Sequence, residues 1–167
     1  MQMEDKLPLI GTLAVDALVI PSFFPHETID DLCRIIDASA DRKMWFDLDS
    51  VDCPKSVAAA GRYAAERLSI AFNCALLKWY RLSDENPSEA YRFHVDPPDL
   101  RKVPLCLVTL KGRAELVYVS SRSELVCIDS EQNTVVLLSP SLLHRVSQPL
   151  GPGGERYLLF LGYRTEK

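Results

Sequence analysis

The sequence has no cluster of basic residues, no long apolar run and no closely spaced cysteine pair. Its formal net charge is −4, so it lacks the electrostatic footprint of proteins that bind phosphate backbones. No apolar run approaches the roughly 18 residues that span a bilayer. The five cysteines stand singly, without the spacing of zinc ligands. We therefore expect free, largely buried thiols and neither nucleic acid nor a membrane as partner.

The length of the chain limits the number of domains. The 167 residues, 47% of them hydrophobic, are enough to bury one core but too few to indicate two independent domains. We expect a single domain over residues 1–167. The stretch from Met1 to Leu7 carries acidic residues where a signal peptide requires basic ones. A cytoplasmic location is the expectation.

The first part of the chain carries two helical patterns. Residues 13–20 are rich in Leu, Val and Ile and end at Pro21, which predicts a strand. Pro25 suits the first position of a helix, and apolar residues then recur at helical spacing at Ile29, Leu32, Cys33 and Ile36. After a polar link over 37–52, Pro54 opens a second helical pattern, formed by Val57, Ala60, Ala64, Leu68, Ala71 and Phe72.

From about residue 76 the pattern changes to short β-rich runs separated by turn-forming groups. The runs are at about 76–82, 90–96, 103–111, 114–119, 124–128, 133–139, 143–147 and 156–163. Two helices followed by about eight short strands predict a mainly β fold, an antiparallel double sheet with helices on one side. The supporting helices are expected within about residues 1–75, and the β-sheet core within about residues 76–163.

Two residues with metal-binding side chains stand two positions apart in the predicted strand 90–96. Residues i and i+2 of a strand point to the same face, so His94 and Asp96 can offer an imidazole and a carboxylate to one metal ion. The pattern is short, and an ordinary pair of strand residues is the alternative. Of three histidines, His26 falls at a helix start, which leaves His144 as the candidate third ligand. Its alternative is a hydrogen-bonded core histidine.

Such a set of ligands has a characteristic chemistry. Two histidines and one carboxylate on one side of an octahedral ion leave positions open for a cosubstrate and oxygen, as in non-haem Fe(II) oxygenases. Arg156 begins the last apolar run, where an unpaired cation facing the core would be costly. A guanidinium can bind the far carboxylate of 2-oxoglutarate in bidentate fashion. Exposure at a strand edge is the alternative for Arg156.

Several short segments occur in an order and spacing that match a known family. They are Trp79-Tyr80, Tyr91 to Pro98, Gly112 to Leu116, His144 to Val146 and Gly154 to Tyr157. Residues 78–163 thereby resemble the 2-oxoglutarate and Fe(II)-dependent oxygenases, and within them the prolyl-hydroxylase-like branch. One departure is Ala114, which stands where the family pattern has a second glycine.

The resemblance implies a fold and a role for each matched residue. The fold would be a double-stranded β-helix, or jelly roll, with two N-terminal helices supporting its larger sheet. The implied Fe(II) ligands are His94, Asp96 and His144, with Arg156 on the far carboxylate of 2-oxoglutarate. Tyr80 and Tyr91 match pocket tyrosines, and Tyr80 is either a cosubstrate hydrogen-bond donor or an aromatic packing residue. Thr109 falls near the position of a helper for the same carboxylate.

The implied activity is hydroxylation of a C–H bond in a protein residue, an amino acid or a small metabolite. Fe(II), 2-oxoglutarate and O2 would be required, succinate and CO2 would be coproducts, and ascorbate is a candidate stimulant. One alternative is a nucleic-acid demethylase of the same superfamily, against which the lack of basic patches counts. The other is a cupin-like metal-binding or scaffold module without catalysis. Arg101 and Lys102 either line the rim of the site and favour an anionic substrate or are ordinary surface charges.

Overall fold

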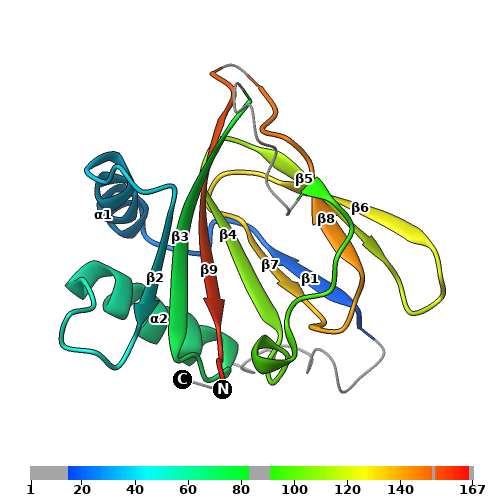
Figure 1. Ribbon diagram of the computed structural model, residues 1–167, viewed down its shortest axis with the longest axis horizontal. Coiled ribbons are helices and arrows are strands. Elements are labelled where there is room, and N and C mark those ends of the chain that lie inside the picture. Colours follow the sequence, from blue (N-terminus) through cyan, green and yellow to red (C-terminus); the bar gives the residue numbers. More distant parts are fainter. Residues whose placement is uncertain (1–14, 83–90, 152, 166–167) are drawn as a thin grey trace, which may run out of the picture.

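The computed structural model describes residues 15–82, 91–151 and 153–165, which form two antiparallel sheets and two α-helices (Figure 1). The six-stranded major sheet has the order β1-β7-β4-β9-β3-β2, and the three-stranded minor sheet has the order β6-β5-β8. The strands are β1 (Ala17–Ile20), β2 (Lys43–Asp47), β3 (Cys74–Arg81), β4 (Leu105–Lys111), β5 (Ala114–Val119), β6 (Leu125–Ser130), β7 (Val135–Leu138), β8 (His144–Val146) and β9 (Glu155–Gly162). The helices are α1 (His26–Asp37), α2 (Lys55–Leu68) and a short 3-10 turn, η2 (Pro98–Leu100).

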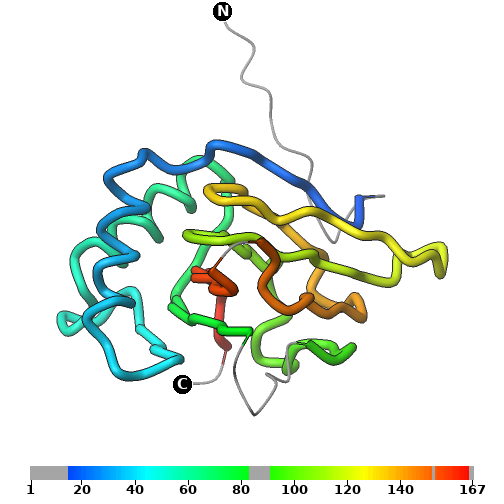
Figure 2. The backbone as a smooth tube through the Cα atoms, turned by 90° about the horizontal axis from the view of Figure 1, so that it is seen from above, coloured from blue at the N-terminus to red at the C-terminus, as the bar shows by residue number. Residues whose placement is uncertain are grey.

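The major sheet is the middle layer of the molecule. Helices α1 and α2 cover its outer face, and the minor sheet faces its inner face (Figures 1 and 2). Side chains alternate along each strand, so one set packs under the helices and the other between the sheets. Leu77 and Leu159 belong to the core under the helices, whereas Leu116 and Phe160 belong to the core between the sheets. This arrangement confirms the predicted mainly β jelly roll with two supporting helices.

Three local differences from the sequence predictions have physical causes. β2 lies within the predicted polar link 37–52. Its apolar run is only three residues long, Met44 to Phe46, and polar residues flank it on both sides, so its signal as a strand is weak. The second helix ends at Leu68, because Ser69 adopts a left-handed conformation with φ of 53°. Ala71 and Phe72 therefore lie beyond the helix.

The predicted strand 90–96 is the third difference. Its described part, 91–96, forms a single β-bridge between His94 and His144 rather than a continuous strand. Residue 90 and the N-terminal residues 1–14, which include the start of the predicted strand 13–20, lie outside the described residues. Within the described part of the chain, no helix is long and apolar enough to cross a membrane.

Candidate metal and cosubstrate site

Three potential metal ligands from separate parts of the sequence meet at one point. His94 and Asp96 lie on the segment between β3 and β4, and His144 is the first residue of β8. The backbones of the two histidines are joined by paired N–H···O bonds of 2.9 Å. The ligand atoms of His94, Asp96 and His144 all lie within 4.8 Å of one another, close enough to share one ion. The third histidine, His26, is exposed at the start of α1 and takes no part.

Hydrogen bonds to the backbone orient both imidazole rings. His94 donates from Nδ1 to the carbonyl oxygen of Arg92 at 2.8 Å, and His144 donates from Nδ1 to that of Leu142 at 2.9 Å. The Nε2 atoms are thereby left unprotonated in the neutral rings, and each lies 3.7 Å from a carboxylate oxygen of Asp96. Burial lowers the pKa of His144, which favours the neutral imidazole that a metal ion requires.

Arg101 is hydrogen-bonded to the backbone of the ligand segment, the stretch between β3 and β4 that carries His94 and Asp96. Arg101 donates from Nε to the carbonyl oxygen of Asp96 at 2.6 Å. Lys102 instead lies over the ring of Tyr163, with its Nζ 4.5 Å from the ring centre. Arg101 therefore supports the conformation of the segment that carries Asp96, a role that neither sequence interpretation of this residue foresaw.

Arg156 is a buried cation, only 1% exposed, so the alternative of an exposed strand edge is wrong. It donates to the Thr109 hydroxyl from Nε at 3.1 Å and from Nη2 at 3.0 Å. Its Nη1 has no hydrogen-bond partner among the described residues, and no described carboxylate forms an ion pair with it. Burial lowers the pKa of Arg156, as expected of a cation removed from water without an anionic partner.

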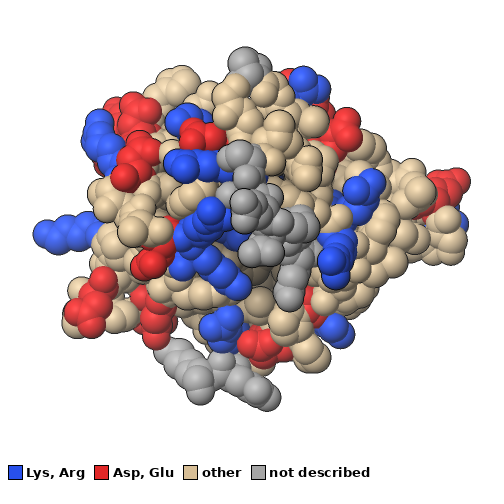
Figure 3. Space-filling model, turned by 45° about the horizontal axis from the view of Figure 1, so that its top comes forward, with Lys and Arg blue, Asp and Glu red and all other residues tan. Residues whose placement is uncertain are grey.

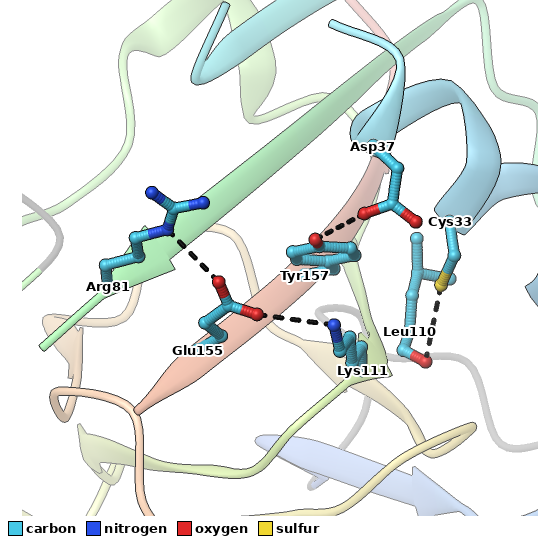
Figure 4. Close-up of polar contacts among 7 residues, drawn as sticks. All are labelled: Cys33, Asp37, Arg81, Leu110, Lys111, Glu155 and Tyr157. Atoms are coloured by element: carbon cyan, nitrogen blue, oxygen red, sulfur yellow. Dashed lines mark hydrogen bonds and ion pairs between the residues drawn. The ribbon is translucent and has the colours of Figure 1, made fainter. Parts of the chain in front are cut away.

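The residues on either side of Arg156 hold it in this inward position. Glu155 accepts hydrogen bonds from Arg81 at 3.1 Å and from Lys111 at 3.3 Å, and the Tyr157 hydroxyl donates to Asp37 at 2.6 Å (Figure 4). Neighbouring residues of a strand point to opposite faces of the sheet. Because Glu155 and Tyr157 make these contacts on the outer face, the Arg156 side chain points to the inner face.

The predicted pocket tyrosines lie beside this guanidinium. Tyr80 is directly opposite Arg156 in the β3–β9 register, with Cζ of Arg156 5.8 Å from its ring centre. The rings of Tyr80 and Tyr91 are 5.8 Å apart. Burial raises the pKa of Tyr80 to about 12, so its hydroxyl is a neutral donor at ordinary pH. Tyr91 lies three residues before His94 in the chain and its ring lies next to that of Tyr80. It therefore stands between the metal-ligand set and Arg156.

Ser130 is a site residue that the sequence analysis missed. It is buried at the end of β6, and its Oγ lies 2.8 Å from the Thr109 hydroxyl. Since Thr109 accepts from Arg156, its own hydrogen is available for Ser130. The sequence carries little signal for this contact, because Ser130 belongs to a predicted turn and meets Thr109 only when the two sheets pack together.

The donor set fits a divalent metal ion and a carboxylate ligand. Two imidazole nitrogens and one carboxylate lie close enough to share one ion, which matches the preference of Fe(II) in open sites. The uncompensated Arg156 provides a donor for an anion that the described residues do not supply. Two histidines and one carboxylate with open coordination positions are the arrangement characteristic of non-haem Fe(II) oxygenases.

The solved structures that share this fold include three proteins of the 2-oxoglutarate/Fe(II) oxygenase superfamily. The viral collagen prolyl hydroxylase of Paramecium Bursaria Chlorella virus-1 is 16% identical, with a TM-score of 0.67 over 99% of this chain and 98% of that one. A Pseudomonas putida prolyl-4-hydroxylase is 18% identical, with a TM-score of 0.59 over 91% and 94%. OsALKBH1 is 16% identical, with a TM-score of 0.55 over 90% and 99%.

All three belong to the 2-oxoglutarate/Fe(II) oxygenase superfamily, so the predicted resemblance is confirmed at the level of the fold. The viral enzyme has also been solved as a 2-oxoglutarate complex, which is 17% identical to this chain with a TM-score of 0.64 over 92% and 97%. No family model and no curated protein matches the sequence.

Proposed function

We propose that the protein is an Fe(II)- and 2-oxoglutarate-dependent dioxygenase that hydroxylates a C–H bond. The observation that supports this most directly is Arg156, a buried guanidinium whose Nη1 has no partner among the described residues, in a jelly roll that also brings His94, Asp96 and His144 together. An isolated buried cation is unfavourable, so a bound anion would offset its desolvation. The neighbours solved as prolyl hydroxylases add support from the fold.

Each residue has a proposed part. His94, Asp96 and His144 hold Fe(II), and Arg156 binds the far carboxylate of 2-oxoglutarate while Thr109 orients the guanidinium. The Tyr80 hydroxyl is a donor for the same cosubstrate, and Tyr91 lines the pocket. When bound, iron supplies O2 activation, by which 2-oxoglutarate is oxidised to succinate and CO2 and one oxygen atom enters the substrate C–H bond. Tyr80 and Arg156 are both buried, so this end of the site is shielded from water.

We propose that the bond hydroxylated in the prime substrate is a C–H bond. The substrate is a protein residue, an amino acid or a small metabolite. The net charge of −4 continues to favour these over nucleic acid. The single-domain organisation, the cytoplasmic location and stimulation by ascorbate stay predictions.

The function is tested in two measurements on purified protein. Anaerobic addition of 2-oxoglutarate to the Fe(II)-loaded protein should produce a visible charge-transfer absorption band, and Arg156→Ala should require a higher 2-oxoglutarate concentration for it. Under O2 with ascorbate, slow succinate formation without prime substrate is expected, and Asp96→Ala should abolish it. A protein that gives neither the absorption band nor succinate, although Fe(II) is bound, contradicts the proposal and favours a non-catalytic module.

A further inference from the structure

A cation–ring contact joins the two segments that carry the metal ligands. Arg145 follows His144 on β8, and its Cζ lies 5.2 Å from the centre of the ring of Phe93, the residue before His94. Figure 1 shows the ligand segment running beside β8. Among the cation–ring contacts between described residues, this is the one that links the ligand segment to β8.

The backbone pairing of the histidines explains why these two side chains meet. His94 and His144 form an antiparallel bridge, and each donates its backbone N–H to the carbonyl oxygen of the other. Extended by one residue, the pairing places Phe93 opposite Arg145. In an antiparallel ladder, the position next to a hydrogen-bonded pair has no backbone hydrogen bonds of its own, and its side chains lie closer together. At this position a side-chain contact is therefore what can hold the two segments together.

The contact lies on the outer face of the minor sheet, away from the metal ligands. His144 is opposite Tyr118 in the β5–β8 register, and Tyr118 belongs to the core between the sheets. Side chains alternate along a strand, so Arg145 and its neighbour Val117 on β5 point outward. Phe93 is 41% exposed, as expected on this face. The pair would therefore touch neither metal nor cosubstrate and could act on them only through the adjacent histidines.

The surroundings of Arg145 differ from those of a typical surface arginine. On the face shown in Figure 3, Lys and Arg side chains lie mixed with Asp and Glu. Arg145 instead makes no salt bridge with a described carboxylate, and its Nε is buried without a hydrogen-bond partner among the described residues. The negative face of an aromatic ring attracts a guanidinium. The ring of Phe93 is therefore the contact that fixes the position of this cation.

The ligand segment has few backbone links to β8 that could replace this contact. Residues 91–96 form a single bridge rather than a continuous strand. One bridge fixes one pair of residues but allows the segment to twist about it. The centres of the two imidazole rings are 4.5 Å apart, and such a twist would change their separation. A second contact one residue away from the bridge restrains the twist.

We propose that Phe93 and Arg145 form a positioning pair that holds His94 and His144 at the separation that one metal ion requires. This inference rests on the proposed dioxygenase function, because it assigns to that metal site two residues that are not ligands. Contacts outside the ligand set orient metal ligands and thereby set metal affinity. Loss of either member of the pair lowers metal affinity while all three ligands stay in place.

The test is the affinity of the full chain for Mn(II), measured by competition against a fluorescent chelator. Arg145→Ala and Phe93→Leu should each lower it about two- to fivefold, the range expected of one exposed cation–ring contact. Phe93→Tyr keeps the ring and should bind Mn(II) as wild type does. Arg122→Ala, an equal loss of charge in the exposed turn between β5 and β6, is the matched control and should also keep wild-type affinity.

The double variant Phe93→Leu/Arg145→Ala should bind Mn(II) about as well as either single variant, because each change removes the same contact. Thermal unfolding of the metal-free variants is measured alongside and should stay close to wild type.

Three results would overturn the inference: losses that multiply in the double variant, an equal loss in Phe93→Tyr and Phe93→Leu, or affinity losses that only follow a loss of metal-free stability. The wild-type protein separates this inference from the proposed function. If wild type binds Mn(II) and both single variants match it, only the positioning pair fails. If wild type binds no Mn(II), the proposed dioxygenase function fails as well.

Discussion

The Thr109 hydroxyl accepts hydrogen bonds from both Nε and Nη2 of Arg156, at 3.1 and 3.0 Å. One neutral oxygen on β4 thus fixes one edge of a guanidinium on β9, and its own hydrogen is directed to Ser130 at 2.8 Å. On the other edge, Nη1 has no hydrogen-bond partner in the part of the chain that the structure describes. This relationship orients a buried cation without neutralising it, as a site for an anionic cosubstrate requires.

Thr109→Val should reduce both stability and 2-oxoglutarate affinity. Valine has nearly the shape of threonine but leaves two buried Arg156 donors without an acceptor, at an expected loss of roughly 1–3 kcal/mol in the free energy of unfolding. Thr109→Ser, which keeps the hydroxyl, is the control and should stay close to wild type. Urea denaturation and calorimetric titration of 2-oxoglutarate measure the two effects. Equal behaviour of the two variants would show that the hydroxyl has no such role.

Arg156→Lys should weaken 2-oxoglutarate binding by about tenfold or more, although the positive charge is kept. A lysine cannot donate to Thr109 and to both oxygens of a carboxylate in the planar geometry of a guanidinium. Titration of 2-oxoglutarate into the anaerobic Mn(II) protein measures the affinity. An unchanged affinity in Arg156→Lys would place the cosubstrate carboxylate elsewhere.

Asp96→Asn should lower metal affinity at least tenfold, because the carboxylate that lies 3.7 Å from both histidine Nε2 atoms loses its charge. The expected change in stability without metal is small, since the Asp96 side chain is not part of the core. Asp49→Asn, which removes one exposed carboxylate, is the control for net charge. Competition of Mn(II) against a fluorescent chelator measures the affinity. Parallel losses in both variants would attribute the effect to net charge alone.

Arg101→Ala should lower metal affinity about tenfold, although all three proposed ligands stay in place. Its 2.6 Å hydrogen bond to the Asp96 carbonyl oxygen positions the ligand segment, and outer contacts of this kind typically change metal affinity by about 10–100-fold. Lys102→Ala is the neighbouring control, because Lys102 contacts Tyr163 rather than the ligand segment. The same chelator competition applies, with thermal unfolding of the metal-free protein to separate positioning from stability. If Arg101→Ala binds metal as wild type does, the contact is incidental.

Gly112→Ala should destabilise the fold by more than about 2 kcal/mol. Gly112 has φ of 78°, and a Cβ atom there would lie 2.0 Å from the Glu155 carbonyl oxygen, at the turn between β4 and β5. Gly151→Ala is the matched control, since Gly151 also has positive φ, 88°, but no atom of the described residues beyond its chain neighbours lies within 4 Å of its added Cβ. The difference between the two unfolding free energies isolates the steric clash from the backbone strain. Equal losses in the two variants would exclude the clash.

Local patterns in the sequence predicted most of the elements. Helix α1 and the later strands follow from apolar residues at periods of 3.6 and 2, and these periods survive in the fold because each element buries one face. β2 escaped prediction because it is short, lies at an edge and buries only Met44 and Phe46. The segment around His94 was predicted as a strand, yet only one bridge forms there.

By itself, the sequence determined the fold class and the residues that are candidates for metal and cosubstrate, because residue type and order carry that chemistry. Only the tertiary structure decided how they meet. The distance between His94 and His144, the two hydrogen bonds from Arg156 to Thr109, and the contact of Arg145 with Phe93 all join residues far apart in the chain. Such contacts depend on strand register and sheet packing, which arise from the whole core and leave no trace in local periodicity.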